Sequence, residues 1–199
     1  MRILVTREDI GERVAALGHV PLLCPLIRIE PLGDEPVDAR DYDWLVVTSR
    51  NGARELARRG VAANRIAAIG PATADALRDG GLQVDLVADT HTQEGMRDAL
   101  PQGRLLLAAA EGARRDVLDA DFVPLYRTVE LRPEVPDADL ALLTSGSAAR
   151  ALAASGARMP VVAIGPQTAA EARKAGLDVV AVAQNHDLDG LIEALRTCS

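Results

Sequence analysis

Two pairs of short polar turns in the sequence could bind a negatively charged ligand. VTSRNGA at 47–53 is repeated as LTSGSAA at 143–149, and AIGPATA at 68–74 is repeated as AIGPQTA at 163–169. Ser, Thr and Gly-Pro are typical of the turn that opens a helix, and we expect Gly70 and Gly165 to allow a sharp turn there. The first N–H groups of a helix have no partner within it and carry about half a positive charge, so they attract anions. Each turn alone is better explained as an ordinary helix cap, whereas the paired occurrence favours a ligand with several negative groups.

Tyr126 is a candidate for a chemical step. The run PLYRT places it at the end of an expected strand, beside an expected crossing between domains. A phenol can donate a hydrogen bond to a departing hydroxyl, although with an ordinary pKa of about 10 it is a weak acid. The alternative is that the ring packs at the seam between the domains. Carboxylates are plentiful but scattered, so no acid–base pair stands out.

Motifs for other chemistry are absent from the sequence. There is no Walker-type phosphate loop, dinucleotide fingerprint, zinc-protease motif or serine nucleophile elbow. His91 and His186 occupy equivalent positions in the repeated sequence, each just before an expected helix cap, Thr92 or Asp187. Without a third ligand at useful spacing, we interpret both, and His19 as well, as surface turn residues. We expect no metal and no cofactor.

Composition argues against nucleic-acid and membrane partners. The chain has 199 residues, a net charge of −7, one Trp, two Tyr and one Phe, whereas nucleic-acid binding needs a basic face or stacking rings. No stretch approaches the roughly 20 apolar residues of a membrane span, and a strand pattern follows Met1 without a signal peptide. Cys24 and Cys198 lack metal-ligand spacing and fit a reducing compartment. We expect a cytoplasmic monomer that binds a small molecule.

Short apolar runs alternate with Ala-rich helical segments, which predicts an α/β fold with parallel sheets. In 8–18, for example, Ile10, Val14 and Leu17 recur at helical spacing and Gly18 closes the segment. A second predicted helix covers 147–155. The expected strands are 2–6, 21–29, 44–48, 66–69, 84–88, 104–108, 122–129, 140–144, 161–164 and 179–183.

The sequence also repeats on a longer scale. Residues 43–60 align with 139–156, and 66–100 align with 161–195. A period of about a hundred residues is too long for a solenoid and indicates a duplicated domain. Two similar halves that face each other would form a cleft for a ligand.

The Pro- and Asp-rich stretches 31–41 and 132–139 both fall inside a repeat, so we interpret them as linkers. PLIRIE before the first stretch matches PLYRTV before the second. The chain should therefore enter one globule, build the other, and return. We expect a discontinuous first domain, 1–31 with 133–199, and an inserted second domain, 32–132, joined by two adjacent crossings that act as a hinge.

Seven motifs in order resemble the uroporphyrinogen-III synthase family. They are VTSRNG, AIGPATADAL, EGARRDVL, a strand ending in YRT, LTSGSA, AIGPQTAAEARKAGL and DLDGLIEAL. The resemblance implies two flavodoxin-like α/β domains joined by a two-stranded crossing. It implies a reaction in which hydroxymethylbilane, a linear tetrapyrrole with eight carboxylates, loses water and closes to uroporphyrinogen III. Ring D is inverted through a spirocyclic intermediate, and no cofactor takes part.

The resemblance also implies roles for individual residues. Tyr126 would assist departure of the hydroxyl group. The substrate carboxylates would be held largely through backbone N–H groups at Thr48, Ser49, Asn51, Gly70, Thr73, Ser145, Gly165 and Thr168.

Arginine side chains could add to this binding, and the candidates are Arg7, Arg54, Arg114 and Arg150. Each is equally credible as a solvated helix residue. The chain is short for this family, so we expect some loops or helices to be trimmed. The alternative function is a non-catalytic two-domain binder or sensor of a polyanionic small molecule.

Overall fold

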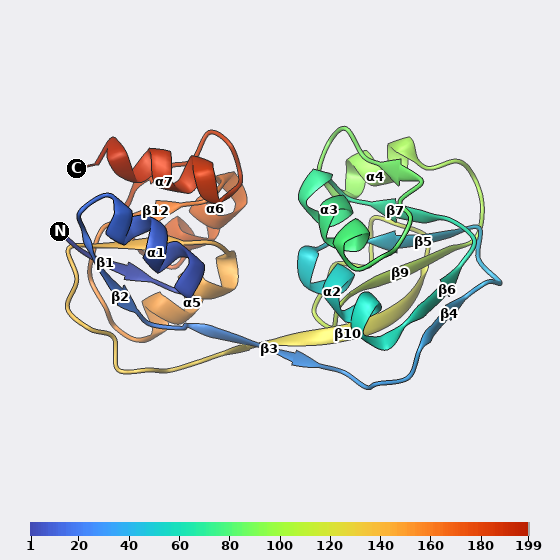
Figure 1. Ribbon diagram of the computed structural model, residues 1–199, viewed down its shortest axis with the longest axis horizontal. Coiled ribbons are helices and arrows are strands. Elements are labelled where there is room, and N and C mark those ends of the chain that lie inside the picture. The colour runs from blue at the N-terminus through green and yellow to red at the C-terminus, as the bar shows by residue number, and fades with distance from the viewer. Residues whose placement is uncertain (199) are drawn as a thin grey trace. The chain divides into compact units, whose positions relative to one another are not determined.

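The structure, a computed structural model, describes residues 1–198. The chain divides into two compact units. Unit 1 consists of Met1–Arg28 together with the chain from Val129 onward, and unit 2 is Ile29–Thr128. Each unit is described below by itself, with the elements as labelled in Figure 1.

Unit 1 is built on a five-stranded sheet whose strand order is β13-β12-β11-β1-β2. Every pair of neighbours is parallel. The central strands are buried apolar runs, as expected of a parallel sheet covered on both faces. The bounds are β1 (Arg2–Val5), β2 (Val20–Leu23), β11 (Leu140–Leu143), β12 (Val161–Ala163) and β13 (Val179–Val182).

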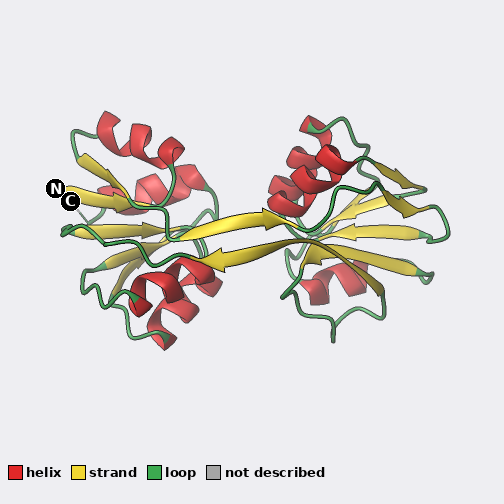
Figure 2. Cartoon of the chain, turned by 90° about the horizontal axis from the view of Figure 1, so that it is seen from below, coloured by secondary structure: helices red, strands yellow, loops and turns green. Residues whose placement is uncertain are grey.

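Helices cover both faces of this sheet, as the cartoon in Figure 2 shows. Ile10 in α1 and Leu191 in α7 belong to a buried cluster on one face, whereas Leu152 in α5 and Ala172 in α6 belong to a cluster on the other. The helices are α1 (Glu8–Ala16), α5 (Gly146–Ala154), α6 (Pro166–Lys174) and α7 (Leu188–Arg196).

Unit 2 contains a six-stranded sheet with the order β3-β10-β9-β5-β7-β8. The pairs from β10 to β8 are parallel. The boundaries between the units fall inside β3 and β10, which are neighbours in this sheet. The bounds are β3 (Ile27–Pro31), β5 (Trp44–Val47), β7 (Ile66–Ala68), β8 (Leu86–Val87), β9 (Leu105–Ala110) and β10 (Asp121–Glu130).

Three helices pack on the sheet of unit 2: α2 (Arg50–Arg59), α3 (Pro71–Asp79) and α4 (Gln93–Ala99). Leu56 in α2 and Leu77 in α3 are fully buried in the cluster on one face. On the other face Met96 of α4 shares a cluster with Leu118, which lies in the loop between β9 and β10. A loop therefore covers part of this face.

Two details of the predicted strands are wrong. The expected strand 21–29 is two strands, because β2 ends at Leu23 and β3 begins at Ile27. The stretch 31–41, interpreted as a linker, contains β4 (Val37–Ala39), which pairs in parallel with β6 (Val61–Ala63). Val37 and Ala39 are buried whereas Asp38 between them is exposed, so a three-residue alternation forms the strand. The mixed α/β fold with mostly parallel sheets is confirmed.

Candidate functional site

The predicted turns lie at the carboxyl ends of parallel strands, so those of each unit share one edge of its sheet. In unit 2, Thr48 and Ser49 follow β5, and Gly70 comes two residues after β7. In unit 1, Ser145 and Gly165 follow β11 and β12 in the same way. Ligands of open parallel sheets bind at this edge, in front of the helix N-termini.

The first kind of turn is capped by serine in both units. The Ser49 hydroxyl accepts a hydrogen bond from the Gly52 N–H at 3.0 Å, and Ser145 accepts one from Ala148 at 3.1 Å. The backbone angles of the two caps agree, with φ −161° and ψ 155° at Ser49 and φ −160° and ψ 156° at Ser145. Asn51 lies in the first turn of α2.

The second kind of turn has glycine at the cap and so leaves the helix start without a capping side chain. Gly70 opens α3 and Gly165 opens α6, each followed by Pro at the start of the helix. Thr73 and Thr168, in the first turns of these helices, are 5% and 6% exposed. Uncapped N–H groups at these two helix starts remain available to a carboxylate.

The reason for glycine at these caps is close contact and not a sharp turn, so that part of the prediction is wrong. Both residues have φ −178°, an extended conformation open to any residue. A Cβ on Gly70 would lie 2.9 Å from the His91 ring, and one on Gly165 would lie 3.2 Å from the His186 ring. Both histidines are exposed, so each imidazole lies over a glycine cap while remaining open to solvent.

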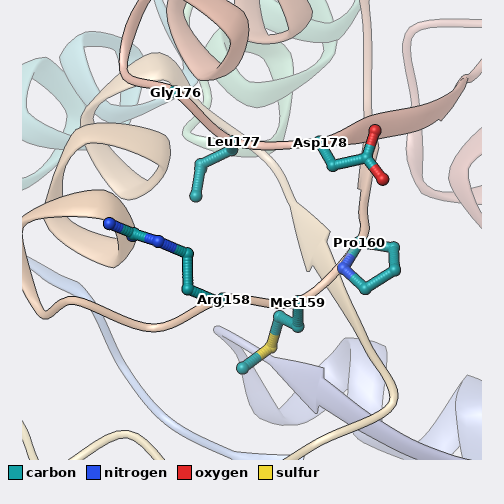
Figure 3. A pocket seen from close by; sticks show the side chains of 6 residues that line it. All are labelled: Arg158, Met159, Pro160, Gly176, Leu177 and Asp178. Atoms are coloured by element: carbon teal, nitrogen blue, oxygen red, sulfur yellow. The ribbon is translucent and has the colours of Figure 1, made fainter.

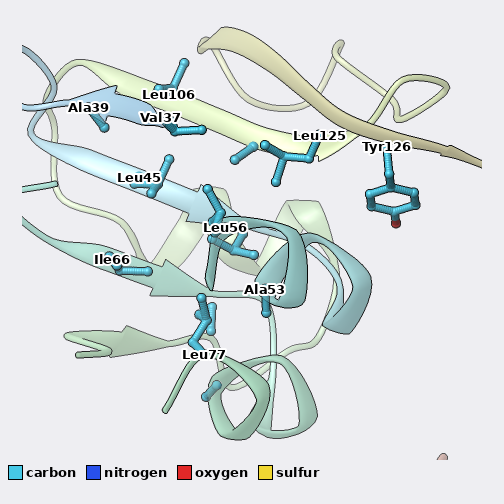
Figure 4. Close-up of a cluster of buried hydrophobic side chains, with 14 residues drawn as sticks. Val37, Ala39, Leu45, Ala53, Leu56, Ile66, Leu77, Leu106, Leu125 and Tyr126 are labelled. Carbon is cyan, nitrogen blue, oxygen red and sulfur yellow. The ribbon is translucent and has the colours of Figure 1, made fainter. Parts of the chain in front are cut away.

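Tyr126 contacts the serine-capped turn at the start of α2 in unit 2. Its hydroxyl lies 2.9 Å from the Ser49 hydroxyl. The pairing of β10 with β9 shifts register between Pro124 and Tyr126, at the point where the ring reaches the helix start. Figure 4 shows the ring at the end of the apolar cluster that includes Leu125 and Leu56.

The surroundings of Tyr126 act on its pKa in two directions. The residue is 6% exposed, and this burial raises the pKa of the phenol above its ordinary value. Hydrogen bonding with the Ser49 and Asn51 side chains acts to lower the pKa, without offsetting the burial. Tyr126 is therefore a neutral hydrogen-bonding group near pH 7. Of the predicted site residues, the structure brings together Tyr126, Ser49 and Asn51.

Three of the four arginine candidates already have carboxylate partners within the protein. Arg7 pairs with Asp9 beside it, and Arg114 pairs with Glu94 in α4. Arg150 pairs with both Glu130 and Glu171, and Arg54 is exposed. A substrate carboxylate at Arg7, Arg114 or Arg150 would therefore have to replace an existing ion pair.

One polar side chain at the edge of unit 1 was missed by the sequence reasoning. Thr6 follows β1 directly and is 8% exposed, and its hydroxyl has no hydrogen-bond partner among residues 1–198. An unsatisfied buried hydroxyl costs about 1–3 kcal/mol and is uncommon. The available signal was a third copy of the strand ending, because Thr6 in VTR matches Thr48 in VTS and Thr144 in LTS.

The cavity in Figure 3 lies elsewhere. It has a volume of about 230 Å³, and its lining residues are Arg158, Met159, Pro160, Gly176, Leu177 and Asp178. Since Pro160 directly precedes β12 and Asp178 directly precedes β13, the cavity sits at the amino ends of these strands, opposite the polar turns. Within residues 1–198, no cluster of three or more His, Cys, Asp or Glu is placed to hold a metal ion.

Comparisons with known proteins identify relatives of this chain. A family model described as uroporphyrinogen-III synthase HemD matches residues 8–193. The chain belongs to the uroporphyrinogen-III synthase family. This confirms the resemblance seen in the seven motifs, and the family is an enzyme family of porphyrin biosynthesis.

Two curated relatives and one solved structure extend the comparison. The chain is 29% identical over 227 residues to a putative uroporphyrinogen-III synthase of Archaeoglobus fulgidus, with 99% of both chains covered. It is 27% identical over 241 residues to the porphyrin biosynthesis protein HemD of Ruminiclostridium josui, which covers 98% of this chain and 48% of that protein. The chain thus spans about half the length of the second relative. A mutant uroporphyrinogen III synthase of Thermus thermophilus has a similar fold, with a TM-score of 0.65, 18% identity and coverage of 99% and 98%.

No helix within residues 1–198 is long and apolar enough to cross a membrane.

Proposed function

We propose that this protein is a uroporphyrinogen-III synthase that converts hydroxymethylbilane to uroporphyrinogen III without a cofactor. The observation that carries the proposal is the family match over residues 8–193, which includes the polar turns and Tyr126. The contact between Tyr126 and the start of α2 supports a chemical role for this residue, because it places a phenol at the edge where ligands bind.

We propose that helix starts of both units bind the carboxylates of the substrate. The binding groups would be the backbone N–H groups around Thr48, Ser49, Asn51, Gly70, Thr73, Ser145, Gly165 and Thr168. The net charge of −7 disfavours a polycarboxylate ligand at long range, so local donors must supply the affinity. The uncapped starts of α3 and α6 are the strongest candidates, since no capping side chain accepts a hydrogen bond from their N–H groups. Arg7 and Arg114 would contribute by exchanging Asp9 and Glu94 for substrate carboxylates.

Tyr126 would act on the leaving group. The carbon–oxygen bond of the hydroxymethyl group breaks, its electron pair stays with the oxygen, and the pyrrole nitrogen supplies electrons to the carbon. The phenol passes its proton to the departing oxygen along their hydrogen bond, so that the oxygen leaves as water. The phenolate regains a proton when a ring carbon loses its proton after the new carbon–carbon bond forms. Tyr126 therefore ends the reaction as the neutral phenol.

Positioning would decide which isomer forms. The azafulvene left after loss of water closes without inversion when it is free in solution. A substrate held by its carboxylates can instead present the substituted carbon of ring D, which gives a spirocyclic intermediate that fragments and closes again. Orientation of this kind can supply several kcal/mol of selectivity without a strong acid or base.

We further propose that the two units correspond to two flavodoxin-like domains, with domain bounds of 1–31 and 133–199 for the first and 32–132 for the second. The strand order of unit 1 supports this. Numbered along unit 1, the strands lie in the order 2-1-3-4-5 of that fold.

The proposed activity is tested with hydroxymethylbilane generated enzymatically in the same reaction. After oxidation, the uroporphyrin isomers are separated by chromatography. Isomer III is expected in excess over a control without the protein. Isomer I alone, at the level of that control, would overturn the proposal. Tight binding of the bilane without isomer III would favour the non-catalytic binder.

A further inference from the structure

Three groups form a continuous hydrogen-bonded row at the start of α2. The Gly52 N–H donates to the Ser49 hydroxyl oxygen at 3.0 Å, and the Ser49 and Tyr126 hydroxyl oxygens are 2.9 Å apart. Each hydroxyl has a single hydrogen to donate. The Ser49 oxygen already accepts from Gly52, so its own hydrogen is available to the phenol oxygen. Either hydroxyl can be the donor in the contact between them. When Ser49 is the donor, the row runs in one direction and the hydrogen of Tyr126 is left for another acceptor. The Asn51 side chain also hydrogen bonds the phenol and acts to lower its pKa, as a second donor to the phenol oxygen does.

We propose that Ser49 is a positioning residue for Tyr126, donating to the phenol oxygen so that the phenol hydrogen is directed at the leaving hydroxyl of the substrate. The inference rests on the proposed function and adds a side-chain role for Ser49 to the binding role of its backbone. Hydrogen bonds in such a row polarise one another. A phenol that accepts from Ser49 is a stronger donor than one whose oxygen is unpartnered.

Burial of Tyr126 increases the effect of the Ser49 hydroxyl on the phenol. Tyr126 is 6% exposed, so solvent offers its oxygen little stabilisation when negative charge develops there. The start of α2 supplies about half a positive charge, and the Gly52 N–H transmits it through Ser49. The row thus couples the helix start to the phenol.

Unit 1 provides the matched control. Ser145 caps α5 with the same geometry, but the residue that aligns with Tyr126 in the PLIRIE and PLYRTV motifs is Ile27. Ile27 is half-buried and packs on the cluster beneath α5. The serine cap of unit 1 therefore exists without a phenol, so in a titration of Tyr126 the loss of Ser145 reports only on the loss of a cap.

The first test measures the phenol directly and does not depend on enzyme activity. The chain has two tyrosines, so a Tyr42→Phe background leaves Tyr126 as the only one. Its pKa is read from the ultraviolet absorbance of tyrosinate, with circular dichroism recorded at each pH to confirm that the protein is folded. Ser49→Ala is expected to raise the Tyr126 pKa, whereas Ser145→Ala leaves it unchanged. An unchanged Tyr126 pKa in Ser49→Ala would overturn the proposal.

The second test is a double-mutant cycle on kcat. Ser49→Ala should lower kcat about fivefold, as expected for one hydrogen bond of about 1 kcal/mol, and Ser49→Thr should restore it because the hydroxyl is retained. In a Tyr126→Phe background the further effect of Ser49→Ala on kcat should fall below about twofold. An equal loss in both backgrounds would show that Ser49 acts independently of Tyr126. If the unmodified protein forms no isomer III, the proposed function fails, and the titration still decides whether Ser49 acts on the phenol.

Discussion

Units 1 and 2 have equivalent central sheets, although the chain builds the two sheets in different orders. In unit 1 the Asp139 carboxylate accepts a hydrogen bond from the Arg2 N–H at 2.7 Å, and in unit 2 Asp43 accepts one from Arg104 at 2.8 Å. Each bond fixes the register at the start of two central strands, so β9 is the counterpart of β1. Along the chain, β1 is the first strand of its sheet, whereas β9 is the fourth of the five parallel strands of unit 2. The spatial order of a sheet therefore does not depend on where the chain enters it.

The two units differ most at the connection that follows these counterpart strands. Unit 1 has α1 between β1 and β2, whereas residues 111–120 of unit 2, all of which are described, form turns and no helix. The loop covers the sheet with Leu118, and the Arg115 guanidinium stacks 3.9 Å from the centre of the Phe122 ring. This loop is where a helix present in one unit is absent from the other.

Tyr126 and Ile27 make the second difference, and it concerns function. The helix starts, serine caps and glycine caps occur in both units, so they serve what the units have in common, which we propose is carboxylate binding. The phenol occurs in unit 2 alone at this position. Features shared by the units indicate binding, and the unshared residue indicates chemistry.

The largest effect that tests this equivalence is expected at two paired glycines. A Cβ on Gly95 would lie 2.2 Å from the Thr90 carbonyl oxygen, and one on Gly190 would lie 2.1 Å from that of Asn185. Neither contact can be relieved without moving backbone. Gly95→Ala and Gly190→Ala should each lower the free energy of unfolding by about 2–3 kcal/mol, measured by urea denaturation.

The control for both substitutions is Gly112→Ala. Nothing lies within 4 Å of a Cβ at Gly112, so the change should stay within about 0.5 kcal/mol. A large effect in one unit and none in the other would show that the two turns are not equivalent.

The sequence predicted features that depend on neighbouring residues. The serine caps were placed correctly because capping is a contact over three residues, as between Ser49 and Gly52. The glycine caps were placed correctly because Gly-Pro is typical of a helix start. The strands 44–48 and 140–144 were found because their apolar runs are continuous. By contrast, β4 is three residues long, too short for a pattern to be distinguished from a linker.

The contacts that were not predicted join distant parts of the chain. Ser49 and Tyr126 are 77 positions apart, and no local pattern reports on such a pair. Gly70 was assigned to a sharp turn. The contact that requires glycine instead comes from His91, which follows α3 in the sequence. The break between β2 and β3 was also hidden, because Leu26 within it is fully buried and continues the apolar run.

The next largest effect is expected on activity at the unshared residue. Tyr126→Phe removes the hydroxyl while keeping the ring in its cluster. We expect kcat for isomer III formation to fall about tenfold, which corresponds to about 1.4 kcal/mol of transition-state stabilisation from one weak acid. Steady-state kinetics with hydroxymethylbilane measure the change.

The control for this change is Tyr42→Phe. The Tyr42 hydroxyl contacts the exposed Asp121 carboxylate at 2.9 Å and lies outside the proposed site. Its loss should leave kcat unchanged. If Tyr126→Phe retains full kcat, the phenol is a packing residue like Ile27, and the functional difference between the units disappears.

The smallest effect concerns the two-stranded sheet of β4 and β6, for which unit 1 has no counterpart among its described residues. The Arg40 side chain and backbone N–H both hydrogen bond Asp38, and they lower the pKa of that carboxyl to about 2 from an ordinary 3.8. Because the folded-state pKa is depressed, the contribution to stability is complete above pH 4 or so and is lost as the pH falls toward 2. NMR titration should give a midpoint of about 2, and Arg40→Gln should return it toward the ordinary value. Both groups are exposed, so added salt should weaken the pKa shift of Asp38. A titration midpoint that is unaffected by Arg40→Gln would show that the Arg40–Asp38 ion pair does not form in this two-stranded sheet.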